Sequence, residues 1–344
     1  MLKGEELKRY SRQVILPEIG ISGQEKLKNA KVLMIGAGGL GCPVLQYLVA
    51  AGVGEIGIVD DDIVDISNLH RQILYGVNDV GGLKAVLAKE KLELLNPNVF
   101  ITAYPVRFTS ANAEAICGVY DLVIDGSDNF ATRYLVNDTC VTLNKPLVFG
   151  SIFKFEGHIS AFNFQNGPDY RDVFPEAPPA DEVPNCAEIG VLGVLPGIIG
   201  TYMANEAIKI ICGIGETLSG KLMTINALNN TISFFKVGKP KQSIVKPTVK
   251  TIDQEITMDE LNTWLLEYPD EICLIDVRET YEFEDYNIGR INIPLYELQD
   301  RIEELPSDKK LIFCCQTGQR SKMAIQLLKP LYKGEMYNLK NGLS

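Results

Sequence analysis

The stretch Lys31-Val32-Leu33-Met34-Ile35-Gly36-Ala37-Gly38-Gly39-Leu40-Gly41 decides the fold of the first part of the chain. Its apolar run, Val32 to Ile35, predicts a buried parallel strand, and a helical pattern follows from Cys42 to Ala51. Between them lies the glycine pattern G-x-G-x-x-G, which in a strand–turn–helix context presents backbone N–H groups to a phosphate. The stretch therefore predicts a nucleotide-binding α/β domain, without separating NAD from ATP.

An acidic residue ends the next predicted strand. This strand covers Glu55 to Val59, and Asp60 follows it at about 20 positions from the glycine turn, where a carboxylate usually takes the ribose hydroxyls. Further aspartates follow directly, with Arg71 close behind. Adjacent carboxylates are unfavourable beside a dinucleotide's pyrophosphate, and they suit a site where a cation and Arg71 balance the charge. A solvated acidic turn is the alternative.

Lys84 and Asp128 occupy two further positions suited to a nucleotide's phosphates. Lys84 lies in the first turn of a predicted helix, Leu83 to Leu95, where a cation is unfavourable unless an anion lies close by. Asp128 follows the predicted strand Tyr120 to Asp125, and open α/β sheets bind ligands beyond the carboxyl ends of their strands. Asp128 is therefore a candidate metal ligand. The alternative is that it caps the predicted helix Phe130 to Leu143.

The bulk composition fits buried cores and argues against several classes of function. The chain has 344 residues, 46% hydrophobic and 22% charged, which is enough for two domains. A net charge of −11 argues against nucleic acid as a partner. We see no secretory signal and no apolar run that would span a membrane. The eight cysteines form no C-x-x-C pair, which favours a reducing, cytoplasmic location.

Two long segments carry little periodicity. Gln165 to Ala187 holds five prolines and is typical of a lid or binding loop, with Cys186 near its end. Lys236 to Lys250 holds five lysines, two prolines and no acidic residue, which predicts an interdomain linker. A second α/β pattern begins after this linker.

The second pattern places a cysteine at the end of a strand. The predicted strand Leu311 to Cys314 is followed by Cys315-Gln316-Thr317-Gly318-Gln319-Arg320-Ser321, which opens a helix. Backbone N–H groups of such a loop face the cysteine sulfur, and the helix N-terminus and Arg320 favour the thiolate of Cys315. A buried inert cysteine is the alternative. Strand alternation makes Cys314 a core residue, and five further cysteines lie on apolar patterns: Cys42, Cys117, Cys140, Cys212 and Cys273.

This loop resembles that of the rhodanese sulfurtransferases. The arginine comes five positions after Cys315, whereas protein tyrosine phosphatase loops place it six positions after the cysteine. The runs L-I-D-V-R-E (Leu274 to Glu279) and I-G-R-I-N-I-P (Ile288 to Pro294) are also similar to that family. The resemblance implies that Cys315 carries a persulfide sulfur.

Six ordered motifs resemble a second family. They are R-Y-S-R-Q (Arg9 to Gln13), G-A-G-G-L-G (Gly36 to Gly41), D-D-D-I-V-D-I-S-N-L-H-R-Q (Asp60 to Gln72), Lys84, G-S-D-N (Gly126 to Asn129) and N-C-A-E-I-G-V-L-G (Asn185 to Gly193). Together they are similar to the MoeB/ThiF adenylyltransferases of molybdopterin-synthase and thiazole biosynthesis, which activate ubiquitin-like sulfur carriers. The resemblance covers roughly residues 5 to 237.

The resemblance implies roles for individual residues. The implied nucleotide-binding set is Gly39, Asp60, Ser67, Asn68, Leu69, His70, Arg71, Lys84, Asp128 and Asn129. The implied catalytic set, with the rhodanese loop included, is Arg12, Arg71, Lys84, Asp128, Cys186, Cys315 and Arg320. Within these sets, Asp128 holds Mg²⁺ and Arg12 reaches across a homodimer into the partner's site. Cys186 takes the acyl group or joins a transient disulfide.

One departure from the second family concerns zinc. Many relatives bind zinc through two C-x-x-C pairs, but here Asp169 and Asp172 stand at the first pair and no cysteine follows Phe235 at the second. Two carboxylates without thiolates or histidines do not make a structural zinc site, so we expect no zinc.

These observations predict a two-domain α/β enzyme. Residues 1–237 form a Rossmann-like mixed-sheet ATP-binding domain, 238–252 a linker, and 253–344 a small α/β rhodanese-like domain. The expected reaction is ATP- and Mg²⁺-dependent adenylylation of the C-terminal glycine of a ubiquitin-like sulfur carrier ending in Gly-Gly. Cys315 persulfide then delivers sulfur, which gives a thiocarboxylate for molybdopterin, thiamine or tRNA thiolation. We expect a cytoplasmic homodimer supplied by a cysteine desulfurase or another sulfur donor, with no nucleic acid and no membrane.

Two alternatives stay open at this point. An NAD-dependent oxidoreductase would use the glycine turn and Asp60, but it leaves Arg71, Lys84 and Asp128 without a role. A non-catalytic scaffold that binds a ubiquitin-like partner would have no need for Asp128 or Cys315.

Overall fold

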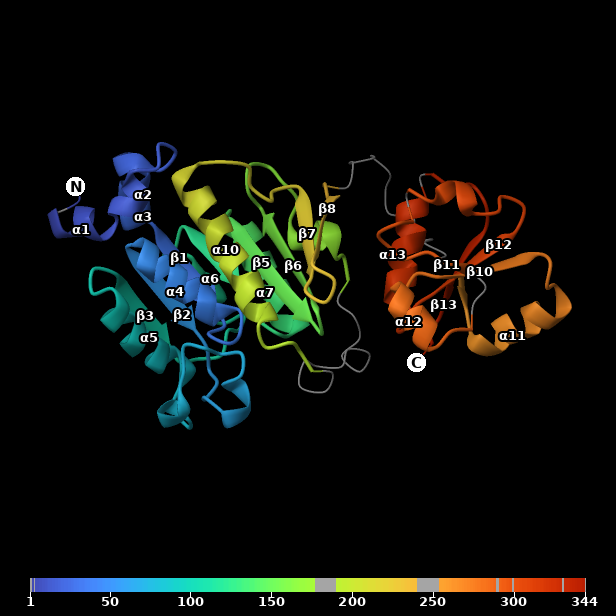
Figure 1. Cartoon of the computed structure of the whole chain (residues 1–344), viewed down its shortest axis with the longest axis horizontal. Coiled ribbons are helices and arrows are strands. Elements are labelled where there is room, and N and C mark those ends of the chain that lie inside the picture. The colour runs from blue at the N-terminus through green and yellow to red at the C-terminus, as the bar shows by residue number, and fades with distance from the viewer. Residues whose placement is uncertain are drawn as a thin grey trace. The chain divides into compact units, whose positions relative to one another are not determined.

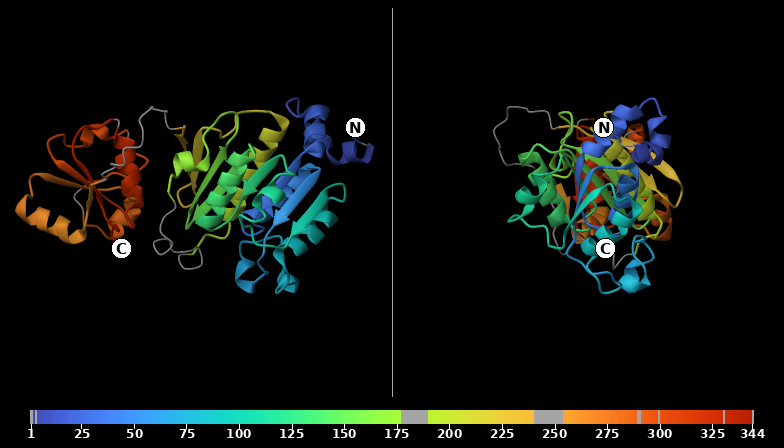
Figure 2. Two further views of the ribbon diagram at one scale, coloured as in Figure 1. Left: turned by 180° about the vertical axis from the view of Figure 1, so that it is seen from behind. Right: turned by 90° about the vertical axis from the view of Figure 1, so that its left-hand side faces the viewer.

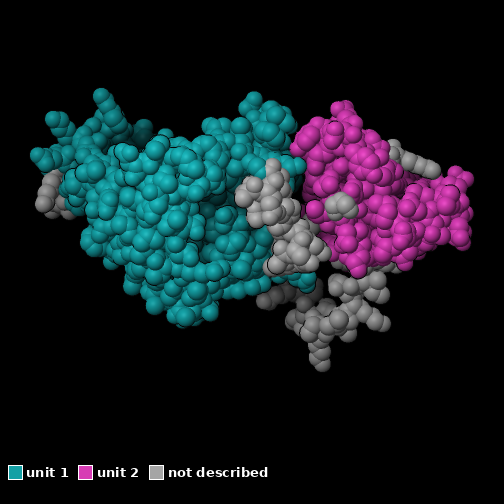
Figure 3. Space-filling view, turned by 90° about the horizontal axis from the view of Figure 1, so that it is seen from below, with its two compact units in different colours: residues 1–241 teal, residues 242–344 magenta. Residues whose placement is uncertain are grey.

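The computed structural model describes residues 2, 4–176, 190–239, 254–288, 291–298, 300–329 and 331–343. Contacts divide the chain into two compact units, Met1–Lys241 and Gln242–Ser344 (Figure 3). Each unit has a sheet of its own. The predicted linker lies almost wholly outside the described residues, as does Cys186.

The first unit is built on an eight-stranded mixed sheet (Figure 1). Its strands are β1 (Lys31–Ile35), β2 (Glu55–Val59), β3 (Phe100–Tyr104), β4 (Leu122–Asp125), β5 (Leu147–Phe153), β6 (Glu156–Phe162), β7 (Lys221–Asn226) and β8 (Thr231–Lys236). The order is β3-β2-β1-β4-β5-β6-β7-β8, parallel from β3 to β5 and antiparallel from β5 onward. The chain order reverses direction at β1, so the crevice above β1 and β4 is where such a sheet binds ligands.

Helices cover both faces of this sheet (Figure 1; Figure 2). They are α1 (Gly4–Arg9), α2 (Ser11–Val14), α3 (Gly20–Asn29), α4 (Gly41–Ala51), α5 (Lys84–Leu95), α6 (Ala113–Cys117), α7 (Phe130–Thr142), α8 (Tyr170–Val173) and α10 (Leu195–Cys212). Apolar residues of α4, α5 and α10 form one core with the sheet. Residues of α6, α7 and α8 form a second core on the other face.

The glycine turn between β1 and α4 owes its shape to two positions. Gly36 has a φ of +88°, a left-handed conformation that favours glycine. A Cβ on Gly41 would overlap the carbonyl oxygen of Gly36, so the helix can approach the strand only because no side chain intervenes. The close approach points the first turn of α4 at the crevice.

The second unit is a five-stranded parallel sheet. Its strands are β9 (Gln254–Ile256), β10 (Ile272–Asp276), β11 (Ile291–Asn292), β12 (Lys310–Cys314) and β13 (Met336–Leu339), in the order β11-β10-β12-β13-β9. The helices are α11 (Met258–Glu267), α12 (Thr280–Asp285) and α13 (Gln319–Leu328). One core contains α13 residues such as Leu328, and the other contains Leu261 of α11.

The predicted fold class is confirmed: a Rossmann-like mixed sheet is followed by a small α/β unit with a parallel sheet. The sequence pattern of Glu5 to Gln13 predicts one short helix, and this prediction was wrong: the segment forms α1 and α2 with a break at Tyr10. Tyr10 is 4% exposed, lies against Gly52, and accepts a hydrogen bond at its hydroxyl from Asn96 Nδ2 at 2.8 Å. Burying this ring requires the chain to turn. No helix in the described part is both long and apolar enough to cross a bilayer.

Candidate active sites

A cavity of about 370 Å³ lies at the carboxyl ends of β1 to β4. Six of the predicted nucleotide-binding residues line it: Gly39, Asp60, Arg71, Lys84, Asp128 and Asn129. They come from the glycine turn, the ends of β2 and β4, the segment after η1 (Ile66–Asn68) and the first residue of α5. The parallel sheet thus gathers residues that are far apart in the sequence.

Asp60 connects the end of β2 to the glycine turn. Its Oδ2 accepts a hydrogen bond from the Ala37 N–H at 2.7 Å, and its Oδ1 accepts one from the Asp62 N–H at 2.9 Å. Burial raises the pKa of Asp60, and the Ala37 N–H opposes that rise. Because a carboxylate offers about four acceptor positions, two remain for the hydroxyls of a ribose.

Lys84 is buried at the start of α5, with 5% exposure. The sequence predicts an anion beside it, and the structure supplies one: Asp62 Oδ2 lies 2.8 Å from Lys84 Nζ. The Asp62 side chain is 70% exposed, so this carboxylate can turn away when a phosphate arrives. The Tyr75 hydroxyl donates to the carbonyl oxygens of Ala37, at 2.8 Å, and Lys84, at 3.2 Å, which ties this helix start to the glycine turn.

Asp128 is not the cap of the following helix, so that alternative was wrong. Asn129 is the N-cap of α7, and its side chain accepts a hydrogen bond from the Thr132 N–H at 2.9 Å. The Asp128 carboxylate lies exposed in the cavity wall with no capping role. Its position fits that of a metal ligand.

The segment before Arg71 is only partly in the cavity. Asp65 caps η1 through the Ser67 N–H at 2.8 Å, and Arg71 is held by the Ser67 carbonyl oxygen at 3.1 Å. Four predicted binding residues are not among those that line the cavity: Ser67, Asn68, Leu69 and His70. Their roles therefore stay predictions.

Arg12 also lies away from the cavity of its own chain. It is exposed on α2, a helix held to α3 by a hydrogen bond from Gln13 Nε2 to Gln24 Oε1 at 2.7 Å. The action of Arg12 on a second copy of the chain stays a prediction.

The cavity also contains residues that the sequence analysis missed. Arg107 follows β3, and Arg133 lies in the first turn of α7, where it donates to the Ser127 carbonyl oxygen at 3.2 and 3.3 Å. Gln72 is 4% exposed and lines the cavity, and its Oε1 has no hydrogen-bond partner in the described part of the chain. The rule that singled out Asp128, namely position after a parallel strand, also applies to both arginines.

The formal charges of the cavity wall balance. Four carboxylates and four cations line it: Asp60, Asp61, Asp62 and Asp128, with Arg71, Lys84, Arg107 and Arg133. A bound triphosphate would add several negative charges, which a divalent cation would offset. Mg²⁺ is usually held by one or two carboxylates together with substrate phosphates, and Asp128 fits that pattern. Across the described ranges no group of three or more His, Cys, Asp or Glu side chains is arranged for a metal.

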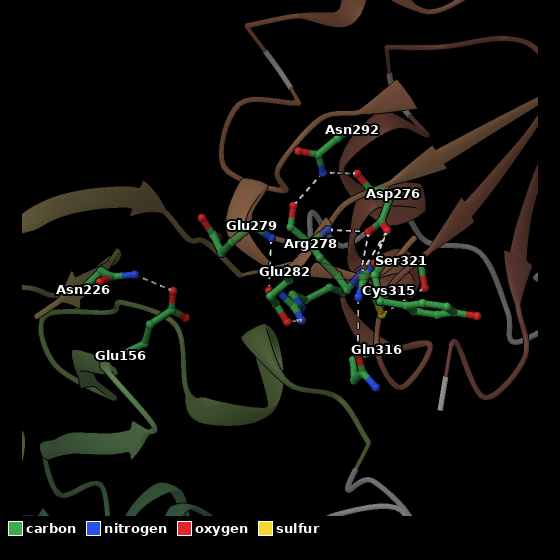
Figure 4. Close-up of polar contacts among 12 residues, drawn as sticks. Glu156, Asn226, Asp276, Arg278, Glu279, Glu282, Asn292, Cys315, Gln316 and Ser321 are labelled. Atoms are coloured by element: carbon green, nitrogen blue, oxygen red, sulfur yellow. Dashed lines mark hydrogen bonds and ion pairs between the residues drawn. The ribbon is translucent and has the colours of Figure 1, made fainter. Parts of the chain in front are cut away.

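In the second unit Cys315 lies at the start of a tight turn after β12 (Figure 4). The Gly318 N–H donates to Cys315 Sγ at 3.1 Å. Gly318 has a φ of +84° and is the N-cap of α13, and a Cβ there would lie 3.2 Å from the Leu339 carbonyl oxygen. Cys315 itself is only 1% exposed, so a sulfur donor must carry its sulfur on a slender group that can reach the buried Cys315 Sγ.

A short hydrogen-bond chain runs behind the sulfur. The Ser321 hydroxyl donates to Asn338 Oδ1 at 2.6 Å and lies 3.4 Å from Cys315 Sγ. A hydroxyl has one hydrogen, so in this arrangement Ser321 accepts from the thiol of Cys315. The hydroxyl must turn before it can donate to a sulfur anion.

Arg320, which is predicted to favour the Cys315 thiolate, is itself paired with a carboxylate, and its action on the sulfur stays a prediction. Its guanidinium makes a bidentate ion pair with Glu282 of α12, at 2.6 and 2.8 Å. Burial raises the pKa of Glu282, but the hydrogen bonds and charge of Arg320, together with the Glu279 N–H and the charge of Arg278, outweigh that rise and hold the pKa below its ordinary value. Glu282 is therefore ionised at neutral pH.

The C-terminal turn supports the Cys315 loop from behind. The Leu343 N–H donates to the carbonyl oxygens of Cys315 and Gln316, at 3.0 and 3.1 Å. Gly342 has a φ of +68°, and a Cβ there would overlap the Cys315 carbonyl oxygen. The remaining described cysteines are buried, as predicted: Cys42, Cys117, Cys140, Cys212, Cys273 and Cys314.

The two sites define an enzyme that joins nucleotide chemistry to cysteine-based sulfur chemistry. The chain belongs to the ThiF family, whose sequence model matches residues 10–255, and it continues into a rhodanese-like domain matched over residues 257–344. Both family resemblances seen in the sequence are thereby confirmed.

Two relatives match nearly the whole chain, and a third matches about two thirds of it. The chain is 42% identical over 368 residues to the probable adenylyltransferase/sulfurtransferase MoeZ of Mycobacterium tuberculosis, covering 99% of this chain and 93% of the relative. It is 40% identical to the adenylyltransferase and sulfurtransferase UBA4 of Meyerozyma guilliermondii, covering 100% and 88%. A sulfur carrier protein adenylyltransferase of Thermus thermophilus is 57% identical over 229 residues, covering 65% of this chain and 84% of the relative. The chain is an enzyme of this adenylyltransferase/sulfurtransferase type, and the oxidoreductase alternative is not favoured.

Solved structures agree on the fold. MccB in complex with N-formylated MccA has a TM-score of 0.62 at 23% identity, covering 68% of this chain and 73% of that chain. MccB of E. coli with ATP has a TM-score of 0.59 at 24% identity, with the same coverage. At this identity the likeness concerns the fold alone.

Proposed function

We propose that the chain adenylylates the C-terminal glycine of a ubiquitin-like sulfur carrier and then converts it to a thiocarboxylate. The observation that carries the proposal is the gathering of Gly39, Asp60, Arg71, Lys84 and Asp128 around one cavity, in a chain that also presents Cys315 at a rhodanese loop. Relatives that match nearly the whole chain are named adenylyltransferase and sulfurtransferase, which supports both halves of the reaction.

The first step is attack on the α-phosphorus of ATP. A carboxylate oxygen of the carrier's last glycine forms the new bond, the bond from the α-phosphorus to the bridging oxygen breaks, and pyrophosphate leaves with the electron pair. Arg71 and Lys84 stabilise the charge that develops on the leaving group, and Asp60 orients the ribose. Asp128 would hold Mg²⁺, which supplies further charge neutralisation when bound.

The second step transfers sulfur to the activated tail. The outer sulfur of a Cys315 persulfide attacks the carbonyl carbon, AMP leaves, and an acyl disulfide forms on Cys315. A thiol then attacks the Cys315 sulfur and forms a disulfide with it, the S–S bond to the carrier breaks, and the carrier leaves as a thiocarboxylate. A reducing thiol from outside the chain then cleaves the new disulfide and frees Cys315. Cys186, outside the described residues, is proposed to supply the first of these thiols or to hold the acyl group first as a thioester.

A homodimer completes the proposed first site. Arg12 is exposed on α2 and lies outside its own cavity, which supports action on a second copy of the chain. Exposed apolar residues follow it, with Ile15 67% and Leu16 48% exposed, and these suit a subunit contact. We further propose that 1–237 and 253–344 are the two functional domains, that zinc is not required, and that the enzyme works in the cytoplasm.

The proposal is tested by ATP–pyrophosphate exchange with recombinant sulfur carriers that end in Gly-Gly. We expect exchange that depends on the carrier and on Mg²⁺, and none with a matched carrier that lacks the last glycine. Mass spectrometry of the carrier after addition of a sulfur donor should show replacement of one oxygen by sulfur. Absence of exchange with every carrier of a broad panel would refute the adenylylation step.

A further inference from the structure

Two arginines approach the Cys315 loop, and each is paired with a carboxylate. Arg278, which Figure 4 labels, follows β10. Arg320 is in the first turn of α13. Their partners are Asp276 and Glu282, respectively. The two pairs differ in burial, and this difference indicates which of them can act on a substrate.

The Arg278–Asp276 pair is part of the core. Asp276 is fully buried and Arg278 is 2% exposed, and their closest contact is 2.6 Å. Arg278 also donates to the Tyr286 carbonyl oxygen at 2.6 Å and to Gln316 Oε1 at 3.4 Å. With its donors committed to protein groups, Arg278 holds the loop in shape and is not available to an incoming anion.

The Arg320–Glu282 pair lies closer to solvent. The side chain of Arg320 is 33% exposed and that of Glu282 is 16% exposed. Two parallel hydrogen bonds join them, a geometry that holds both groups in one orientation. Arg320 is the one cation in the sequence from Cys315 to Ser321, so Glu282 cancels the charge that the loop itself would otherwise present.

We propose that Glu282 is a specificity-determining residue that selects against anionic sulfur donors by neutralising Arg320. The inference rests on the proposed sulfur-transfer function and concerns how Cys315 is loaded. A doubly charged donor such as thiosulfate needs a local cation, whereas a persulfide presented by a partner's cysteine can approach a neutral loop.

The same thiolate attack serves both kinds of donor. With thiosulfate, the Cys315 thiolate attacks the outer sulfur, the S–S bond breaks, and sulfite leaves with the electron pair. With a persulfide donor, the thiolate attacks the outer sulfur and the donor's thiolate leaves. Cys315 becomes a persulfide in both cases, so the two donors differ in charge and not in the bond that is made.

The first test uses Glu282→Gln in the full-length chain with thiosulfate as donor and cyanide as acceptor. The substitution keeps the size of the side chain and removes its charge. We expect KM for thiosulfate to fall about three- to tenfold, with kcat changed by less than about twofold. Glu284→Gln, an exposed residue of the same helix, makes the same change in net charge and should leave KM unaltered. Glu282→Asp retains the charge and should behave more like the wild type than Glu282→Gln does.

A second test is independent of sulfur transfer. Alkylation of Cys315 by iodoacetate, an anion, is compared with alkylation by iodoacetamide, which is neutral, and the modified site is located by peptide mass spectrometry. Both alkylation rates are proportional to the fraction of Cys315 that is thiolate, so this fraction cancels in the ratio of the two rates. We expect Glu282→Gln to raise the iodoacetate-to-iodoacetamide ratio, and Glu282→Gln/Arg320→Gln to return it toward the wild-type value.

The outcomes separate the two levels of the proposal. An unchanged ratio and an unchanged KM in Glu282→Gln, or an equal effect of Glu284→Gln, would overturn the role of Glu282. A wild-type chain that accepts sulfur from no donor would instead overturn the proposed sulfur transfer, while the alkylation ratio would still report on Glu282. Fluorescence of Trp264, the single tryptophan of the chain, checks that each variant's second unit is folded.

Discussion

The two sites of this chain assemble charge in opposite ways. The cavity of the first unit draws charged side chains from the ends of several strands, and four cations and four carboxylates meet there. The Cys315 loop is a single local segment, where the sulfur receives a backbone N–H at 3.1 Å and the nearby arginine is paired with Glu282. Phosphate chemistry needs many fixed charges brought together over long sequence distances, whereas a sulfur nucleophile needs a shaped turn. Variants at each site can separate these two requirements.

Replacing the nucleophile should abolish one activity and spare the other. We expect Cys315→Ala to lose sulfur transfer completely, because no other group in the loop can hold the sulfur, while carrier-dependent pyrophosphate exchange stays near the wild-type rate. Cys314→Ala changes the neighbouring core cysteine and should retain transfer. Loss of exchange in Cys315→Ala would mean that the two sites are not separable.

The converse variant is Asp128→Ala. Because this carboxylate is proposed to hold Mg²⁺ and has no capping role, we expect exchange to fall by about a thousandfold or more, with thiosulfate–cyanide transfer unchanged. Titration with excess Mg²⁺ should not restore it. A variant that exchanges at a normal rate would remove Asp128 from the mechanism.

Lys84→Met tests the buried cation of the cavity. Its ion-pair partner Asp62 is 70% exposed and can be solvated, so the fold should survive while exchange falls about 10²- to 10³-fold. Lys89→Met, on the same helix α5, removes a surface ion pair with Glu93 and serves as the control. Equal losses in both variants would point to damage of the helix and not to a role at the phosphates.

Acid should weaken the first unit before the second. Burial lowers the pKa of His158 to about 4, and an unfolded histidine titrates near 6.5. The unfolded chain therefore binds a proton that the folded chain refuses, so stability falls as pH drops from about 6.5 to about 4. The loss is at most about 3 kcal/mol, because His158 is partly exposed.

Both histidines of the chain lie in the first unit, which makes the effect specific to it. Thermal unfolding followed by circular dichroism should show a first-unit transition whose midpoint temperature falls as the pH is lowered over this range. In His158→Gln that midpoint should depend less on pH. Trp264 fluorescence reports the second unit, and its transition should not respond to that substitution. A matching shift in both signals would contradict the assignment to His158.

The smallest expected effect concerns the hydroxyl behind the sulfur. Ser321→Ala removes one hydrogen-bond partner of Cys315, and we expect sulfur transfer to fall about fivefold, the value of one ordinary hydrogen bond. Pyrophosphate exchange is the internal control and should not change. A transfer rate equal to that of the wild type would show that the Ser321 hydroxyl never turns toward the sulfur.

The sequence predicted those parts of the fold that depend on local pattern. The buried run of β2 was placed with the bounds that the structure has, and those of β1, β4 and β12 within two residues, since apolar runs between turn residues are a local signal. Helices α11 and α12 escaped notice, and so did the break at Tyr10, because that ring is accommodated by Gly52 and Asn96, which come much later in the chain.

The sites show the same limit. The rule that ligands bind beyond the carboxyl ends of parallel strands predicted that Asp60 and Asp128 share one site. Applied to Arg107 and Arg133, the same rule would have added these two cations of the cavity. The pairing of Arg320 with Glu282 spans 38 positions and follows from the tertiary packing of α12 against the start of α13, which no local motif encodes. The sequence therefore predicts which residues belong to a site more readily than it predicts which side chains they pair with.

The hydrogen bonds between the C-terminal turn and the Cys315 loop make the Leu343 amide sensitive to whether Cys315 carries sulfur. The Leu343 N–H is bonded to the loop's own carbonyl groups, so any movement of the loop on loading or discharge must loosen or tighten that amide. Hydrogen–deuterium exchange at this single position could thus follow each turnover without a label on the reactive atom.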